Sequence, residues 1–254
     1  METEKEPELV EMMGCLCRIK EEEAGRYALS RDILFRRIPE EKKPEMVENS
    51  IRCGREYAAR IERKTGTDDP EKAAACYGLR VKSAGGTGKS GDSQKSSSPR
   101  RILFARFTPP DSIEIMEEPL LKYREVLSGL SEETGSLLPS PAEVRRLLTA
   151  HELFHFAEDR DSAKIYTRTE KIRLWGFLGM EARSPVRALG EIAAAAFARA
   201  LCRTDYTPFA LDVLLFYGYD KETARRIFRK MTGMKSGYGG GGYREKNGTG
   251  RFTL

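Results

Sequence analysis

The sequence predicts an α+β fold that is mostly helical and contains a small sheet. Most of the chain between residues 44 and 232 carries apolar residues at helical spacing, which indicates amphipathic helices. Two short segments in the middle, 101–107 and 112–116, are instead rich in β-forming residues, and the second alternates with a period of two. With 39% hydrophobic and 33% charged residues, the 254-residue chain suits a globular domain with polar extensions.

Capping residues indicate where several helices begin and end. Asp69-Pro70 opens one helix and Gly78 ends it, and Ser140-Pro141-Ala142-Glu143 has the pattern of a capping box. The expected helices cover residues 44–65, 69–78, 120–130, 140–158, 186–201, 208–217 and 221–232, and the expected strands cover 79–81, 101–107 and 112–116. Residues 131–139 are expected to form a loop. Residues 164–177 are expected to form a hairpin or an active-site loop, with Trp175 as its anchor.

Three segments stand apart from the expected main domain, residues 44–232. Residues 1–43 are highly charged with sparse apolar positions, so we expect a helical extension, much of it peripheral. Residues 83–100 are rich in glycine and serine, and residues 233–254 are rich in glycine and basic residues. Both compositions are typical of flexible segments, so we expect an insert and a tail.

The insert contains a sequence, Gly88-Lys89-Ser90, that is similar to the end of a phosphate-binding loop. Such a loop needs a glycine at position 83, where this chain has Ser83. It also needs a helix directly after the lysine and serine, whose N-terminus binds the phosphate. Residues 91–99 are not helix-forming, so nucleotide binding is not expected.

The formal net charge of +5 is unevenly distributed. Residues 1–50 carry 9 basic and 13 acidic side chains, whereas residues 221–254 carry 9 basic and 2 acidic ones. A basic tail can contact nucleic acid or an acidic protein partner, or it can simply be solvated.

The chain has no signal for a membrane or for secretion. No apolar run reaches the roughly 18 residues of a membrane-spanning helix. The first residues are acidic and lack the apolar core of a secretion signal. The five cysteines are an odd number without the spacing of a disulfide framework. We therefore expect a cytoplasmic protein with reduced thiols and no membrane partner.

The stretch from Leu147 to Glu158 contains the pattern H-E-x-x-H, and its histidines, His151 and His155, are the only two in the protein. Positions four apart share a helix face, so both imidazoles could bind one metal ion. Glu152 is rotated by about 100° from His151, so it lies beside the metal and can take a proton from a metal-bound water. The pattern predicts a Zn²⁺ site; the alternative is a pair of buried, hydrogen-bonded histidines without metal.

Two histidines leave Zn²⁺ short of a protein ligand. The candidates for the third ligand are Glu158, Asp159, Glu170, Glu181 and Glu191. Glu158 lies on the same helix face, but a straight helix would have difficulty in bringing it to the metal. Glu191 is favoured because it is the one acid in an apolar, alanine-rich helix, where a lone carboxylate is costly unless it is paired or bound to metal.

Three stretches resemble the ImmA/IrrE-type metallopeptidases, small HExxH zinc peptidases of bacteria, phages and mobile elements. They are Asp69-Pro70-Glu71 with Gly78-Leu79-Arg80-Val81, the stretch from Thr149 to His155, and the E-x-x-A-x-x-F-A-x-x-L pattern that begins at Glu191. The resemblance implies a minimal zincin-like core, in which a small twisted sheet packs against the HExxH helix and a second metal-ligand helix. It also implies that Glu191 is the third zinc ligand. Several members of the family cleave transcriptional repressors.

The expected function is therefore that of a zinc metallopeptidase acting on a protein or peptide substrate, such as a transcriptional repressor. Glu152 would be the general base, and Tyr166 is a candidate for stabilising the oxyanion of the tetrahedral intermediate. A second hypothesis is a regulatory binding module that keeps the zincin fold and uses its basic tail to contact nucleic acid or an acidic protein partner.

Overall fold

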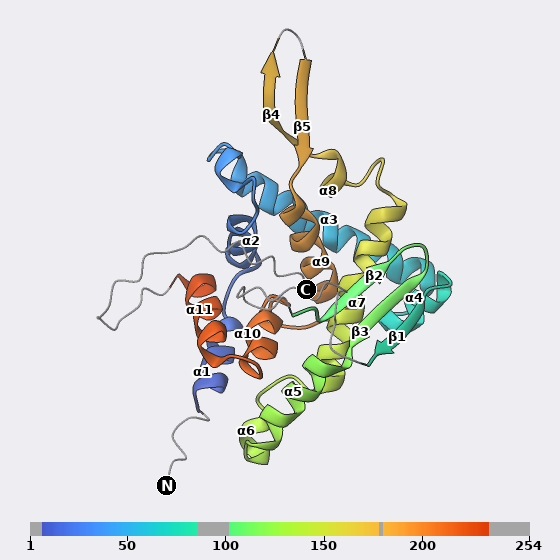
Figure 1. Cartoon of the computed structure of the whole chain (residues 1–254). Coiled ribbons are helices and arrows are strands. Elements are labelled where there is room, and N and C mark those ends of the chain that lie inside the picture. Colours follow the sequence, from blue (N-terminus) through green and yellow to red (C-terminus); the bar gives the residue numbers. More distant parts are fainter. Residues whose placement is uncertain (1–6, 86–101, 178–179, 234–254) are drawn as a thin grey trace, which may run out of the picture.

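The computed structural model of the protein describes residues 7–85, 102–177 and 180–233. These residues form a mostly helical α+β structure with one three-stranded sheet and one separate hairpin (Figure 1). The predicted fold class is confirmed at this level. Two segments expected to be flexible fall largely outside the described residues, namely 86–100 of the insert and 234–254 of the basic tail.

The three-stranded sheet contains β1 (Arg80–Ala84), β2 (Ala105–Thr108) and β3 (Ser112–Met116). The strand order is β1-β3-β2, with β1 parallel and β2 antiparallel to β3, so β2 is an edge strand. The strand expected over 79–81 extends to Ala84, because its residues pair with β3 as far as Met116. The first two residues of the expected flexible insert therefore belong to the sheet. The strand expected over 101–107 begins only at Ala105.

The helices match most of the expected segments within a few residues. They are α1 (Pro7–Leu16), α2 (Glu21–Ser30), the 3₁₀ helix η1 (Phe35–Arg37), α3 (Lys42–Thr65), α4 (Pro70–Cys76), α5 (Glu117–Ser128), α6 (Glu132–Gly135), α7 (Pro141–Arg160), α8 (Tyr166–Thr169), α9 (Arg187–Cys202), α10 (Ala210–Tyr217) and α11 (Lys221–Thr232). The short α6 lies in the segment expected to be a loop. None of the described helices is both long and apolar enough to cross a membrane.

The helix α4 ends as its capping sequence predicts. Asp69 accepts hydrogen bonds from the main-chain N–H groups of Glu71 and Lys72, and Pro70 occupies the first turn. Gly78 adopts a φ of 74°, and the N–H of Leu79 donates to the carbonyl of Ala74 at 3.0 Å. This is a Schellman ending, which requires a left-handed residue and directs the chain into β1.

The N-terminal segment is integrated into the core, which corrects the expectation that much of residues 1–43 is peripheral. Leu9, Met12, Met13 and Leu16 of α1 are all at most 4% exposed. The helix α1 packs against α10 and α11, and α2 packs against α3 and α9. The sparse apolar residues of this charged segment share a single helix face, so four of them are enough to bury it.

The hairpin consists of β4 (Lys171–Phe177) and β5 (Met180–Pro185), and it projects from the body of the protein (Figure 1). It begins later than the expected segment 164–177, whose first part contains α8 instead. Trp175 is 54% exposed, so it is not the anchor that the sequence suggested. The hairpin joins α8 to α9. In the sequence it therefore comes between α7, which contains His151 and His155, and α9, which contains Glu191.

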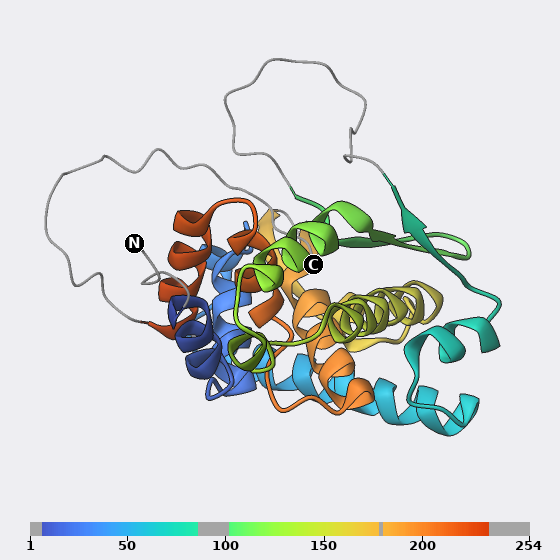
Figure 2. The ribbon, with the colours of Figure 1, turned by 90° about the horizontal axis from the view of Figure 1, so that it is seen from below.

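The core is built around α7, which lies between the sheet on one side and α3 on the other (Figure 2). The helix α9 packs against both α7 and α3. Close approach of α3 and α9 depends on Gly54, because a Cβ added there would lie 2.1 Å from the carbonyl oxygen of Ala193. Since that atom belongs to the backbone, the two helices could not relieve the overlap by a side-chain movement.

We expect Gly54→Ala to destabilise the protein by about 3 kcal/mol, because overpacking forces the α3 and α9 backbones apart. The measurement is the free energy of unfolding from chemical denaturation. Gly14→Ala is the matched control, because Gly14 lies within α1 and a Cβ there would meet nothing within 4 Å. This control should be neutral or stabilising by up to about 1 kcal/mol through helix propensity. Equal effects of the two substitutions would contradict the packing argument.

Candidate metal centre

The helix α7 carries both histidines, and its N-terminus is capped as predicted. The hydroxyl of Ser140 accepts a hydrogen bond from the N–H of Glu143 at 3.1 Å, and Pro141 occupies the first turn. The other half of the predicted capping box is not formed, because the Glu143 carboxylate accepts from the hydroxyl of Tyr206 at 2.8 Å rather than from the N–H of Ser140. The buried face of α7 continues from its apolar first turns to His151, which is 1% exposed. The helix therefore presents its imidazoles at the edge of the hydrophobic core.

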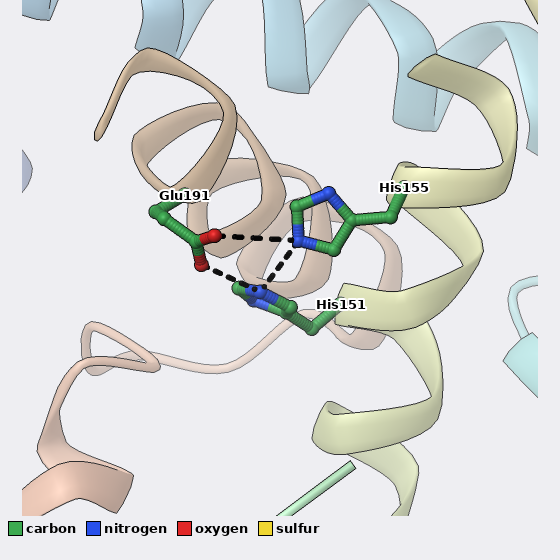
Figure 3. Close-up of side chains that lie close together, drawn as sticks. All are labelled: His151, His155 and Glu191. Atoms are coloured by element: carbon green, nitrogen blue, oxygen red, sulfur yellow. Dashed lines mark hydrogen bonds and ion pairs between the residues drawn. The ribbon is translucent and has the colours of Figure 1, made fainter. Parts of the chain in front are cut away.

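Three side chains from α7 and α9 converge on one point (Figure 3). The Nε2 atoms of His151 and His155 lie 3.1 Å apart. The Glu191 carboxylate faces both, with Oε2 at 3.2 Å from His151 Nε2 and Oε1 at 3.8 Å from His155 Nε2. One possible ligand atom from each residue lies within 4.8 Å of the others. The structure therefore brings together the three residues favoured as ligands.

The donor set fits a zinc ion, because two imidazole nitrogens and a carboxylate are among the usual protein ligands of zinc. Zinc bonds to nitrogen and oxygen are about 2.0–2.2 Å long, so the edges of a regular tetrahedron are about 3.3–3.6 Å. The separations of 3.1 and 3.2 Å lie just below this range, and the separation of 3.8 Å, which involves the other oxygen of Glu191, lies just above it. One cation at the centre would accept all three lone pairs and leave a fourth position for water or substrate.

Glu152 lies beside this group and is 2% exposed. Its Oε2 accepts a hydrogen bond of 2.6 Å from the main-chain N–H of Phe107 in β2, whereas its Oε1 has no hydrogen-bond partner among the described residues. Burial raises the pKa of Glu152, and so does the negative charge of Glu191, whereas the two histidines oppose the shift. A buried carboxylate of raised pKa with one unpartnered oxygen is suited to accepting a proton.

Glu191 stays ionised in this surrounding. Burial raises its pKa, but the hydrogen bond with His151 and the charges of both histidines outweigh that effect and lower the pKa below the ordinary value. The carboxylate is therefore available as an anionic ligand.

The other candidate ligands lie elsewhere. Glu158 contacts His155, but at Nδ1, the ring nitrogen that faces away from the convergence point. Glu181 is on the hairpin, where it pairs with Arg173 and Arg183. Asp159 is exposed, and Glu170 follows the end of α8. Among the described residues, His151, His155 and Glu191 form the one group of three or more metal-binding side chains.

Tyr166 does not face the three ligands as expected for an oxyanion donor. Burial raises the pKa of Tyr166, whereas a hydrogen bond with Asn49 of α3 lowers it. The charges of Glu45, which raises the pKa, and Arg52, which lowers it, also come from α3. The residue lines a surface pocket together with Asn49, Arg52 and Tyr57. Tyr166 follows α7 in the sequence, but the short α8 turns its side chain towards α3.

No family model, no curated protein and no solved structure matches this chain. The assignment of the centre therefore depends on its geometry. Two contacts around the centre were not predicted from the sequence: the hydrogen bond from the N–H of Phe107 to Glu152, and the contact of Glu158 with His155. A main-chain donor leaves no sequence signal, whereas the contact of His155 with Glu158 follows from their spacing of three on a helix.

The protonation of His155 should make zinc binding depend on pH. Burial lowers the pKa of His155, but the Glu158 hydrogen bond and the charges of Glu191 and Glu152 raise it to about 9. A zinc ligand must lose this proton. We therefore expect the apparent zinc affinity to rise about tenfold per pH unit between about pH 6 and 8, measured by competition with a chelator of known affinity at each pH. An affinity that does not change over this range would contradict the assignment.

The stability of the metal-free protein should change with pH in the opposite direction. Because the folded-state pKa of His155 lies above the ordinary value of 6.5, its interactions stabilise the fold fully below pH 6.5. This stabilisation is lost as the pH rises through about 9. Denaturation of metal-free protein over this interval measures the effect, with zinc-loaded protein as the comparison.

Proposed function

We propose that the protein is a zinc-dependent peptidase in which His151, His155 and Glu191 bind Zn²⁺ and Glu152 is the general base. The observation that carries this proposal is the convergence of three ligand atoms from two helices, with a buried carboxylate, Glu152, next to His151 in α7 and one of its oxygens without a partner. The resemblance of the motif stretches to ImmA/IrrE-type peptidases supports it, and so does the small sheet packed against α7. When bound, Zn²⁺ would supply Lewis acidity and lower the pKa of a coordinated water towards about 7.

The role of Glu152 follows from its two oxygens. Oε2 is held by the Phe107 N–H, which fixes the orientation of the carboxylate. Oε1 remains available to take the proton of the attacking water and to pass it to the leaving amine. Since Glu152 is not one of the three residues whose ligand atoms converge, it can change protonation without leaving the metal short of a ligand.

The edge strand β2 offers a place for an extended peptide. The carbonyl of Phe104 accepts a hydrogen bond from the N–H of Met116. Because hydrogen-bonded pairs alternate along an antiparallel ladder, the main-chain N–H and C=O groups of residues 104, 106 and 108 point towards β3. The main-chain groups of Ala105 and Phe107 consequently point away from β3, and the Phe107 N–H reaches Glu152. A peptide that pairs with this edge would lie next to the general base. We propose a protein substrate that presents an extended segment, such as a transcriptional repressor.

Metal analysis combined with a peptidase assay tests the proposal. The purified protein should contain about one zinc ion per chain, as three protein ligands and a water imply. It should cleave candidate repressors or an extended peptide library, as followed by mass spectrometry. Chelation should abolish cleavage, and added zinc should restore it. A protein that binds no zinc, or whose cleavage survives complete removal of metal, would rule out this function.

A further inference from the structure

Glu158 is a buried carboxylate that the proposed chemistry does not use. It is 4% exposed and lies near the end of α7, three residues after His155. Its Oε2 lies 3.3 Å from Nδ1 of His155. Since the other ring nitrogen of His155 faces His151 and Glu191, the imidazole lies between the ligand group and Glu158.

The short helix α8 holds this carboxylate in place. The hydroxyl of Thr167 donates to Glu158 Oε1 at 2.6 Å, and the guanidinium of Arg168 donates to Oε2 at 3.0 Å. Burial raises the pKa of Glu158, but its bonds with His155, Thr167 and Arg168 outweigh burial and lower the pKa, so the group is an anion. Each oxygen of this buried carboxylate therefore has a partner, which a charge at such a position requires.

The helix α9 leaves the space that Glu158 occupies. A Cβ added to Gly190 would lie 2.8 Å from Oε1 of Glu158 and 3.4 Å from its Cδ. Gly190 directly precedes Glu191. The same turn of α9 thus supplies one candidate ligand and admits the carboxylate that contacts another.

We propose that Glu158 is a positioning residue for the metal centre. It accepts the Nδ1–H of His155, which keeps the proton on that nitrogen and directs the Nε2 lone pair towards the metal. Thr167, Arg168 and Gly190 keep Glu158 there. This inference rests on the proposed function in that a metal binds at His151, His155 and Glu191. Carboxylates that orient a metal-bound histidine commonly contribute 10–100-fold to metal affinity.

The experiment compares Glu158→Leu, Glu158→Gln and Glu143→Leu in the full chain. Glu158→Leu should lower zinc affinity by about 10–100-fold, whereas Glu158→Gln keeps an acceptor oxygen and should lose less. Glu143→Leu is the matched control on the same helix, because its carboxylate accepts from Tyr206 rather than from a histidine. It should leave zinc affinity unchanged. Gly190→Ala, which leaves all three ligands in place, should lower affinity by displacing Glu158.

Two further readouts separate positioning from a structural role. The visible spectrum of the cobalt-substituted protein should change in Glu158→Leu and remain as in wild type in Glu143→Leu. In metal-free protein, the Nδ1–H proton of His155 should give a slowly exchanging downfield NMR signal that Glu158→Leu removes. Folded Glu158→Leu that binds zinc as tightly as wild type would overturn the inference.

The NMR signal also keeps the inference distinct from the proposed function. A wild-type protein that binds no zinc would end the zinc proposal. The downfield signal of His155 would still report whether Glu158 holds the imidazole. A wild-type protein without that signal would count against Glu158 whether or not zinc binds.

Discussion

Replacing Glu191 with alanine is expected to lower zinc affinity by about two orders of magnitude or more. Structural zinc sites with four protein ligands bind zinc with a free energy of about 12 kcal/mol. Divided equally, this is about 3 kcal/mol for each ligand, which corresponds to a factor of more than about 100 in affinity. The substitution removes the carboxylate oxygens that lie 3.2 Å from Nε2 of His151 and 3.8 Å from Nε2 of His155. Competition with a chelator at fixed pH measures the affinity.

Glu181→Ala is the matched control for this prediction. Glu181 was a candidate ligand in the sequence, but it pairs with Arg173 and Arg183 on the exposed hairpin, so its removal should leave zinc affinity unchanged. Circular dichroism of both variants without metal checks that the fold survives. If Glu191→Ala holds zinc as tightly as wild type, the third ligand is another residue and the proposed centre is wrong.

Replacing Glu152 with glutamine should reduce peptide hydrolysis by about 10²–10⁴-fold, the usual contribution of a general base. The amide cannot take the proton from water, but its oxygen can still accept from the N–H of Phe107. Because Glu152 is not a ligand, the zinc content should remain at the wild-type level. The turnover of a cleaved peptide and the bound metal are measured on the same preparation.

Glu143→Gln is the corresponding control, because it makes the same chemical change at a carboxylate on the first turn of α7. Its turnover should stay close to wild type. Near-wild-type turnover of Glu152→Gln with full zinc content would exclude Glu152 as the base. Loss of zinc in that variant would instead indicate that Glu152 contributes to binding the metal.

Much of the local structure could be predicted because helix periodicity and capping are short-range properties. Ser140-Pro141 marks the start of α7, and Asp69-Pro70 with Gly78 marks both ends of α4, as the hydrogen bonds of these residues bear out. His151 and His155 lie on the same face of α7 because they are four residues apart on one helix. The isolation of Glu191 among apolar residues indicated that its carboxylate needs a partner, and the structure places both histidines beside it.

The errors occurred where an interaction partner is distant in the chain. Trp175 was expected to anchor its segment, but nothing local to the hairpin decides whether the side chain is covered, and it is exposed. Residues 1–43 looked peripheral because they are highly charged, yet the apolar face of α1 meets α10 and α11 from the other end of the chain. Tyr166 was a candidate oxyanion donor because it follows α7 closely in the sequence. The direction of its side chain is instead set by packing against α3.

By itself, the sequence determined most of the longer helices, the caps of α4 and α7 and the pair His151 and His155, since these depend on residues within one or two turns. Only the tertiary structure decided which carboxylate faces the histidines, that the N–H of Phe107 holds Glu152, and that Thr167 and Arg168 hold Glu158. These contacts join segments that are up to 45 residues apart. Their geometry follows from how α7, α9 and the sheet bury their apolar faces together, and that packing is a property of the whole core.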